Sequence, residues 1–140
     1  MLYTDIKEII ITYKPESDFY LLLGYYIDQI RFGENYIYEN RKCCGFDKDY
    51  DFEWKFETKN DVYNYKNDFL EICKLAIEIK PARIFKTCSG FYTIQIVFKD
   101  GTVKEYSYTL SFEEHGMKEL RDAILKALPA NCKVYPSCIR

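Results

Sequence analysis

The chain has 140 residues, 48% of them hydrophobic and 30% charged, and its net charge is −2. This apolar content excludes a disordered chain, and the near-balance of charge excludes nonspecific nucleic-acid binding, which needs concentrated Lys and Arg. At this length we expect one domain over residues 1–140, with residues 130–140 as a short, loosely attached tail. Aromatic residues make up 18% of the chain, which favours sheet structure and an interaction surface.

No apolar run approaches the roughly 20 residues that a membrane helix requires. The longest run, residues 19–27, contains Gly24. The first ten residues, MLYTDIKEII, lack the charged start, apolar run and small-residue cleavage site of a signal peptide. We therefore expect a cytoplasmic protein without membrane contact, whose six Cys are reduced thiols.

The first third of the chain predicts three strands. Residues 6–15, rich in β-branched side chains, form a predicted strand that ends at Pro15. Residues 24–32 and 36–40 predict a hairpin that turns at Gly33 to Asn35, and RKCCGFD, residues 41–47, predicts the loop after it. Residues 19–23 fit a strand or a helix equally well.

The segment DKDYDFEWKFE, residues 47–57, alternates without a break. A calcium loop is excluded, because an EF-hand needs Gly and Glu where this chain has Phe52 and Thr58. A carboxylate row that imitates nucleic acid stays an alternative, since side chains on one strand face repeat at about 6.6 Å, but Lys55 interrupts that row. The pattern favours an amphipathic strand with charges outward and with these side chains inward: Tyr50, Phe52, Trp54 and Phe56.

A helix is predicted between Thr58 and Pro81. Thr58 and Asp61 have the spacing of an N-terminal capping box, and apolar residues then recur at intervals of three and four. Cys73 falls on the apolar side of this helix, where free Cys packs as a small hydrophobe. Pro81 ends the helix, because the residue before a proline resists the helical conformation.

The strongest local signal is a hairpin around Asp100 and Gly101, within FYTIQIVFKDGTVKEYSYTL. A two-residue loop would set apolar residues against polar ones. A three-residue loop, residues 99–101, with Gly101 left-handed in a bulge, restores matched faces. We therefore predict the bulged loop, with these cross-strand pairs: Ile94 with Tyr106 and Tyr92 with Tyr108.

A second capping pattern, Ser111 to Glu114, precedes a predicted amphipathic helix that carries Met117, Leu120, Ile124 and Leu128 and ends at Pro129. The element order β-β-β-β-α-β-β-α predicts an α+β fold of two layers. It contains a mostly antiparallel sheet of about six strands with two helices packed on one face. The other sheet face is then open to solvent.

Signals for metal binding or catalysis are sparse. The adjacent Cys43 and Cys44, and the pair Cys132 and Cys138, do not have the spacing of structural zinc ligands. Whether Cys132 and Cys138 pair or bind a metal stays open, as does the role of His115, the only histidine. The scattered glycines form no phosphate-binding loop. We therefore predict no catalytic residue, no metal ligand and no cofactor.

The sequence loosely resembles a pattern in small bacterial and phage α+β proteins that have no assigned activity. The stretches that carry this resemblance are GYYIDQIRF, YIYE, EWKFETKND and SGFYTIQIVFKDGTVKEYSY. They correspond in order to a Tyr-rich hairpin, a Trp-containing strand that leads into a helix, and an Asp-Gly hairpin. The resemblance covers most of the chain and implies a bacterial or phage source and a compact domain, without any activity or functional residue.

We interpret the chain as a non-enzymatic binding protein that recognises another macromolecule, as an inhibitor or immunity-type protein binds its protein partner. The surface expected to make that contact consists of Asp47, Asp49, Tyr50, Asp51, Glu53 and Trp54. One alternative is a small-ligand binder, such as a nucleotide-signal sponge, with aromatic rings for stacking and Lys or Arg for phosphate. Another is a small hydrolase or thiol enzyme using His115. A homodimer through an exposed sheet edge also stays open.

Overall fold

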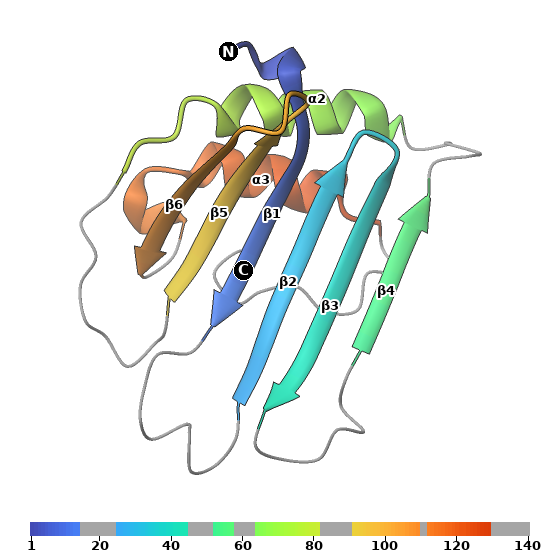
Figure 1. The fold of residues 1–140 in the computed structure, drawn as a ribbon, viewed down its shortest axis with the longest axis vertical. Coiled ribbons are helices and arrows are strands. Elements are labelled where there is room, and N and C mark those ends of the chain that lie inside the picture. The colour runs from blue at the N-terminus through green and yellow to red at the C-terminus, as the bar shows by residue number, and fades with distance from the viewer. Residues whose placement is uncertain (15–24, 45–51, 58–63, 82–90, 110–111, 130–140) are drawn as a thin grey trace.

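The computed structural model describes residues 1–14, 25–44, 52–57, 64–81, 91–109 and 112–129. Within these ranges, six strands form one antiparallel sheet in the order β4-β3-β2-β1-β5-β6, and both α-helices lie on the same side of it (Figure 1). The elements are η1 (Tyr3–Asp5), β1 (Ile6–Lys14), β2 (Tyr25–Gly33), β3 (Tyr36–Cys44), β4 (Phe52–Glu57), α2 (Tyr65–Ala76), β5 (Phe91–Phe98), β6 (Val103–Thr109), η3 (Glu113–His115) and α3 (Lys118–Ala127). The predicted α+β fold is thereby confirmed.

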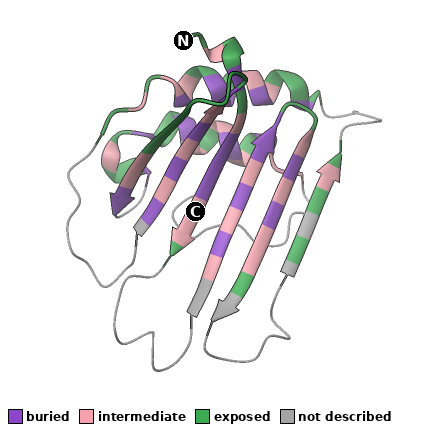
Figure 2. Cartoon of the chain, in the orientation of Figure 1, coloured by how far each residue is buried: buried purple, intermediate pink, exposed green. Residues whose placement is uncertain are grey.

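The face of the sheet that packs against the helices, here called the covered face, holds the hydrophobic core. Its strand residues alternate with more exposed ones, as the banding of the strands in Figure 2 shows. Burying one such Ile or Phe side chain contributes roughly 2 kcal/mol to folding, so this layer supplies most of the stability. Fully buried members from both layers include Ile11, Ile30, Phe32, Ile37, Ile94, Phe98, Ile72 and Ile124.

A bulge in β1 sets the alternation of the central strand. Ile6 and Ile9 are three residues apart, yet both belong to the core. The pairing with β5 shifts between Ile6 and Glu8, so one extra residue is inserted there. As a result Ile9 and Ile11 point to the helices, while Glu8 lies on the opposite face.

The β5–β6 hairpin confirms the predicted bulged loop. Ile94 pairs with Tyr106 and Tyr92 with Tyr108, and Gly101 has a φ of 91°, a left-handed conformation that L side chains avoid. The Phe98 N–H donates to the Thr102 carbonyl at 2.8 Å, which closes the loop. The paired rings of Tyr92 and Tyr108 stack with centroids 5.5 Å apart.

The β2–β3 hairpin is longer than the sequence predicts. Residues 41–44 were expected in a loop, and that prediction is wrong, because β3 runs to Cys44 and pairs with Tyr25. The physical reason is a cross-strand ion pair: Arg41 lies opposite Asp28 and contacts both oxygens of its carboxylate, at 2.6 and 2.9 Å. Such a bidentate pair favours continued strand pairing over a loop.

Both helices differ in extent from the prediction. The expected cap at Thr58 and Asp61 lies outside the described residues; α2 begins at Tyr65, after Asn64 in a left-handed conformation with φ of 54°. The helix ends at Ala76, before Pro81. Ser111 of the second expected capping box also lies outside the described residues. The helix predicted after it is interrupted, because the left-handed Gly116, with φ of 73°, separates η3 from α3. Among the described residues no helix is long and apolar enough to span a membrane.

Candidate functional site

The face of the sheet opposite the helices, here called the open face, carries polar side chains in cross-strand rows. The strand register defines two such rows, each running across all six strands. The amide row consists of Ser107, Thr93, Thr12, Gln29, Asn40 and Glu53. The arginine row consists of Glu105, Gln95, Ile10, Arg31, Tyr38 and Lys55. Because directly paired residues lie on one face of a sheet, each row is a continuous strip of surface.

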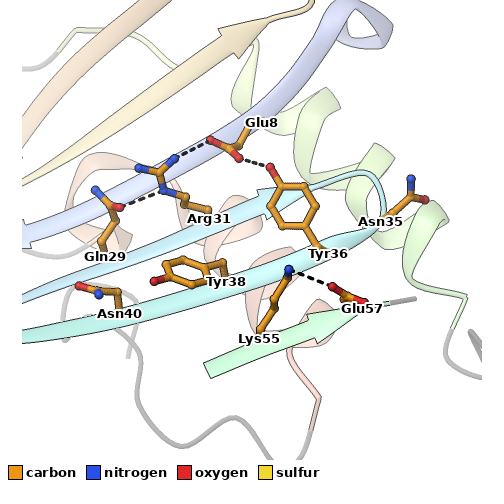
Figure 3. A pocket seen from close by; sticks show the side chains of 9 residues that line it. All are labelled: Glu8, Gln29, Arg31, Asn35, Tyr36, Tyr38, Asn40, Lys55 and Glu57. Carbon is orange, nitrogen blue, oxygen red and sulfur yellow. Dashed lines mark hydrogen bonds and ion pairs between the residues drawn. The ribbon is translucent and has the colours of Figure 1, made fainter. Parts of the chain in front are cut away.

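A hollow of about 920 Å³ opens on this face over β1 to β4 (Figure 3). Among the described residues, its walls contain two carboxylates, two cations, three carboxamides and two tyrosines, and no aliphatic side chain. The lining residues are Glu8, Gln29, Arg31, Asn35, Tyr36, Tyr38, Asn40, Lys55 and Glu57. Each of these side chains ends in a polar group on an apolar stem or ring, so the lining offers both apolar surface and hydrogen-bonding groups, as ligand pockets commonly do.

A chain of hydrogen bonds fixes the side chains at one wall of the hollow before anything binds. Gln29 Nε2 donates to Thr12 Oγ1 at 3.1 Å, and Arg31 Nε donates to Gln29 Oε1 at 3.0 Å. Arg31 Nη1 contacts Glu8 Oε1 at 3.3 Å, and the Tyr36 hydroxyl donates to the other oxygen of Glu8. The guanidinium is therefore held on two sides, while 40% of the Arg31 side chain is exposed.

Gly33 allows Tyr36 to reach Glu8. A Cβ atom at Gly33 would lie 2.2 Å from the Tyr36 ring, so the ring packs directly on bare backbone. From the other side of the sheet, the Tyr65 hydroxyl of α2 donates to the carbonyl of Gly33 at 2.7 Å and lies 3.0 Å from that of Tyr36. The turn is thus fixed by one tyrosine on each face.

Burial and the neighbouring carboxylate both disfavour ionisation of Tyr36. Burial is the larger cause, followed by the hydrogen bond to Glu8, and together they raise the pKa of Tyr36 to about 12. Burial also raises the pKa of Tyr65 well above its ordinary value. Both phenols therefore stay protonated near neutral pH and act as hydrogen-bond donors.

The opposite wall of the hollow is more exposed. Lys55 and Glu57 lie two residues apart on β4 and form an ion pair of 2.9 Å, with side chains 58% and 45% exposed. Both cations among the described lining residues are therefore paired with a carboxylate of the same hollow, and the formal charge of these nine residues is zero.

The covered face also contains charged groups, at the part of the sheet formed by β2 and β3. Asp28 and Glu39 are 5% and 1% exposed, and Arg41 pairs with Asp28. The alternation of core residues in β2 and β3 includes these positions, so sequence reasoning could have found them as charges within an apolar pattern. Sequence reasoning did not identify these charged positions, because it assigned Arg41, the partner of Asp28, to a loop.

Four residues of the predicted contact surface, Asp47, Asp49, Tyr50 and Asp51, lie outside the described residues. Glu53 is exposed at the end of the amide row. Trp54 lies in β4 opposite Glu39, and its side chain is not described. The predicted inward direction of Phe56 is confirmed, since its ring meets that of Tyr65 edge to face at 5.9 Å.

His115, the residue of the hydrolase alternative, and Cys73, the helical thiol, both lie in contact with the fold. His115 Nε2 contacts the backbone carbonyl of Thr109, and the imidazole packs against Tyr108 with centroids 5.1 Å apart. Cys73 is buried in α2 as predicted, and burial raises its pKa to about 12, so the thiol stays protonated and unreactive near neutral pH. Across the described ranges, no group of three or more His, Cys, Asp or Glu could hold a metal ion.

Fold and surface together define an α+β protein in which one face of a six-stranded sheet is covered by helices and the other presents a polar hollow. Comparisons with protein-family models, with curated proteins and with solved structures found no match for this chain.

Proposed function

We propose that this chain is a non-enzymatic binding protein that recognises another macromolecule through the open face of β1 to β4. The observation that carries the proposal is the hollow itself, in which side chains from four strands converge on one solvent-facing site. One residue of the predicted partner surface, Glu53, pairs with Asn40 of the hollow and so lies on this face.

The composition of the hollow supports binding. Tyr and Arg are enriched among the residues that carry most of the energy at interfaces, and here Tyr36, Tyr38 and Arg31 lie together. Arg31 and Tyr36 are already ordered by Gln29 and Glu8. A site ordered in advance loses less conformational entropy on binding, which leaves more of the interaction energy for affinity.

A small-ligand binder is the second candidate, because the volume of the hollow lies within the range of roughly 300–1,000 Å³ that is usual for ligand sites. For a phosphate-bearing ligand, Arg31 and Lys55 would supply charge and Tyr38 a ring for stacking. Both cations are already paired with Glu8 and Glu57, which weakens the case for a phosphate. The contact of His115 with a backbone carbonyl favours a structural role for it over the hydrolase alternative.

The test is capture of a partner from a native lysate by matched variants of the full chain. The double variant Arg31→Ala, Tyr38→Ala removes two central side chains of the hollow, and we expect it to lose the captured partner. The control Gln95→Ala, Glu105→Ala changes two residues of the arginine row outside the hollow, and we expect it to retain capture. Capture that survives in the hollow variant contradicts the proposal.

A third variant, with Asp47, Asp49 and Asp51 changed to Lys, decides how far the surface extends. Loss of capture here, together with loss in the hollow variant, places both segments in one interface. Retained capture in this variant restricts the interface to the described strands. Circular dichroism on every variant checks that the fold is intact.

A further inference from the structure

The hollow has the charge balance of a site for a neutral ligand. Arg31 is paired with Glu8 at 3.3 Å and Lys55 with Glu57 at 2.9 Å, so both cations in the described part of the lining have a carboxylate partner. An anionic ligand would meet Glu8 or Glu57 beside each cation, and a cationic ligand would meet Arg31 or Lys55 beside each carboxylate. These like-charge contacts oppose a charged ligand of either sign, whereas a neutral ligand leaves both ion pairs in place.

The side chains of the hollow include both hydrogen-bond donors and hydrogen-bond acceptors. Guanidinium and ammonium groups only donate, carboxylates only accept, and carboxamides do both. Gln29 and Asn40, which pair across β2 and β3, each carry both a donor and an acceptor. A ligand hydroxyl also donates and accepts, so a ligand with several hydroxyls is the best chemical match to this arrangement.

Two tyrosines supply apolar surface for such a ligand. Tyr36 and Tyr38 lie two residues apart on β3 and on the same face, which separates them by about 6.6 Å along the strand. A phenol ring combines an apolar face with a polar hydroxyl, so it can pack on the C–H face of a sugar ring and still hydrogen-bond. The lining residues that the structure describes include no aliphatic side chain, which makes an aliphatic peptide a poorer match.

We propose that the hollow over β1 to β4 binds a neutral saccharide, so that the macromolecule recognised by the open face is a glycan or carries one. This inference rests on the function proposed above and names its partner class. Tyr38 packs on a sugar ring, while Asn40, Gln29 and the two ion pairs meet its hydroxyls. Arg31 and Tyr36 are positioned for this by Gln29 and Glu8.

The direct test is titration of the full chain with neutral oligosaccharides of glucose, galactose, mannose and N-acetylglucosamine, followed by calorimetry and by amide chemical shifts. Adenosine monophosphate and inorganic phosphate serve as anionic probes. We expect at least one oligosaccharide to bind at millimolar concentration or below. We also expect Tyr38→Ala to weaken it about tenfold, a loss of roughly 1.4 kcal/mol, and Gln95→Ala to leave it unchanged.

Salt dependence gives a second, independent readout. Binding of a neutral ligand releases no counterions, so its affinity should stay nearly constant as NaCl is raised, whereas binding of phosphate should weaken steeply. A steep dependence, or binding of the anionic probes in place of the sugars, overturns the saccharide proposal. Binding that Tyr38→Ala leaves unchanged overturns it as well.

The outcome also separates this inference from the proposed function. If no oligosaccharide binds, while capture of a protein partner is lost in the Arg31→Ala, Tyr38→Ala variant, the saccharide proposal fails and the open face still binds a macromolecule. If no oligosaccharide binds and capture is also unaffected, both fail. If glycosidase treatment of the lysate abolishes capture by the unmodified chain, both are supported.

Discussion

The two faces of this sheet are built from the same strands and follow opposite rules. Ile11 and Ile94 point to the helices and are fully buried, while their neighbours Thr12 and Thr93 belong to the amide row on the open face. On the covered face, packing density determines stability. On the open face, hydrogen bonds arrange side chains around a hollow, and few of them contribute to the core. The comparison teaches that strand alternation separates folding from recognition residue by residue.

Among the described residues of the covered face, charged side chains interrupt the apolar core where β2 and β3 pair. Asp28 and Glu39 lie among core positions of β2 and β3, and Asp28 is neutralised by the bidentate contact with Arg41. Buried ion pairs contribute little net stability, but removal of one partner is costly. This cluster should therefore respond to mutation as the core does, although its residues are as polar as those of the open face.

The largest expected effect comes from the covered face. Ile94→Ala removes a fully buried side chain and should lower the free energy of unfolding by about 2–5 kcal/mol, since it leaves a cavity in the core. Thr93→Ala, the next residue on the open face, should change it by less than about 0.5 kcal/mol. Urea denaturation measures both. Equal losses would contradict the separation of the two faces.

The buried ion pair should show strong coupling. Arg41→Ala should cost about 3 kcal/mol, because it leaves the buried Asp28 carboxylate without its counter-ion. The double variant Asp28→Asn, Arg41→Ala should be less destabilised than Arg41→Ala alone, as a double-mutant cycle in urea would reveal. If the effects of the two substitutions simply add, the pair is not coupled and this reading of the cluster is wrong.

Gly33 offers a test of how the hollow is built. Gly33→Ala should cost about 1–3 kcal/mol, because its Cβ would overlap the Tyr36 ring. In a Tyr36→Ala background the same substitution should cost much less, since the ring is gone. Thermal and urea unfolding of the four proteins provide the comparison. An unchanged cost in that background would show that the ring does not limit this position.

High pH should destabilise the protein through groups on both faces. The pKa of Cys73 rises from 9.0 to about 12, and those of Tyr36 and Tyr108 rise from 10.0 to about 12. The unfolded state releases these protons first, so the stabilising contribution is complete below pH 9 and is lost as pH rises towards 12. Urea midpoints measured from pH 8 upward should fall, and Tyr36→Phe should reduce the slope above pH 10. Urea midpoints that stay constant over this pH range would contradict the raised pKa values of these groups.

The smallest expected effect on stability belongs to the hollow itself. Arg31→Ala breaks a partly exposed ion pair and should change the free energy of unfolding by less than about 1 kcal/mol, while it weakens partner binding. Urea denaturation measures the free energy of unfolding, and capture from a lysate, with the same preparation, measures partner binding. A large loss of stability with unchanged capture would assign Arg31 to the fold and not to recognition.

The fold could be predicted from the sequence wherever local chemistry determines it. The register of the β5–β6 hairpin followed from matched faces and from one left-handed glycine, Gly101. The hollow could not be predicted, because it depends on the strand order that brings β1 beside both β2 and β5. Only then does Glu8 meet Arg31 and Tyr36. The sequence also gives no sign that Asn64, directly before α2, and Gly116, between η3 and α3, adopt left-handed backbone.

The central claim is that the open face of β1 to β4 makes the contact with the partner. Amide hydrogen exchange, measured on the full chain with and without its captured partner, tests this most directly. We expect slower exchange in residues 25–44 and 52–57, with α2 and α3 unchanged. Slower exchange confined to the two helices, with the strands unaffected, would contradict the account.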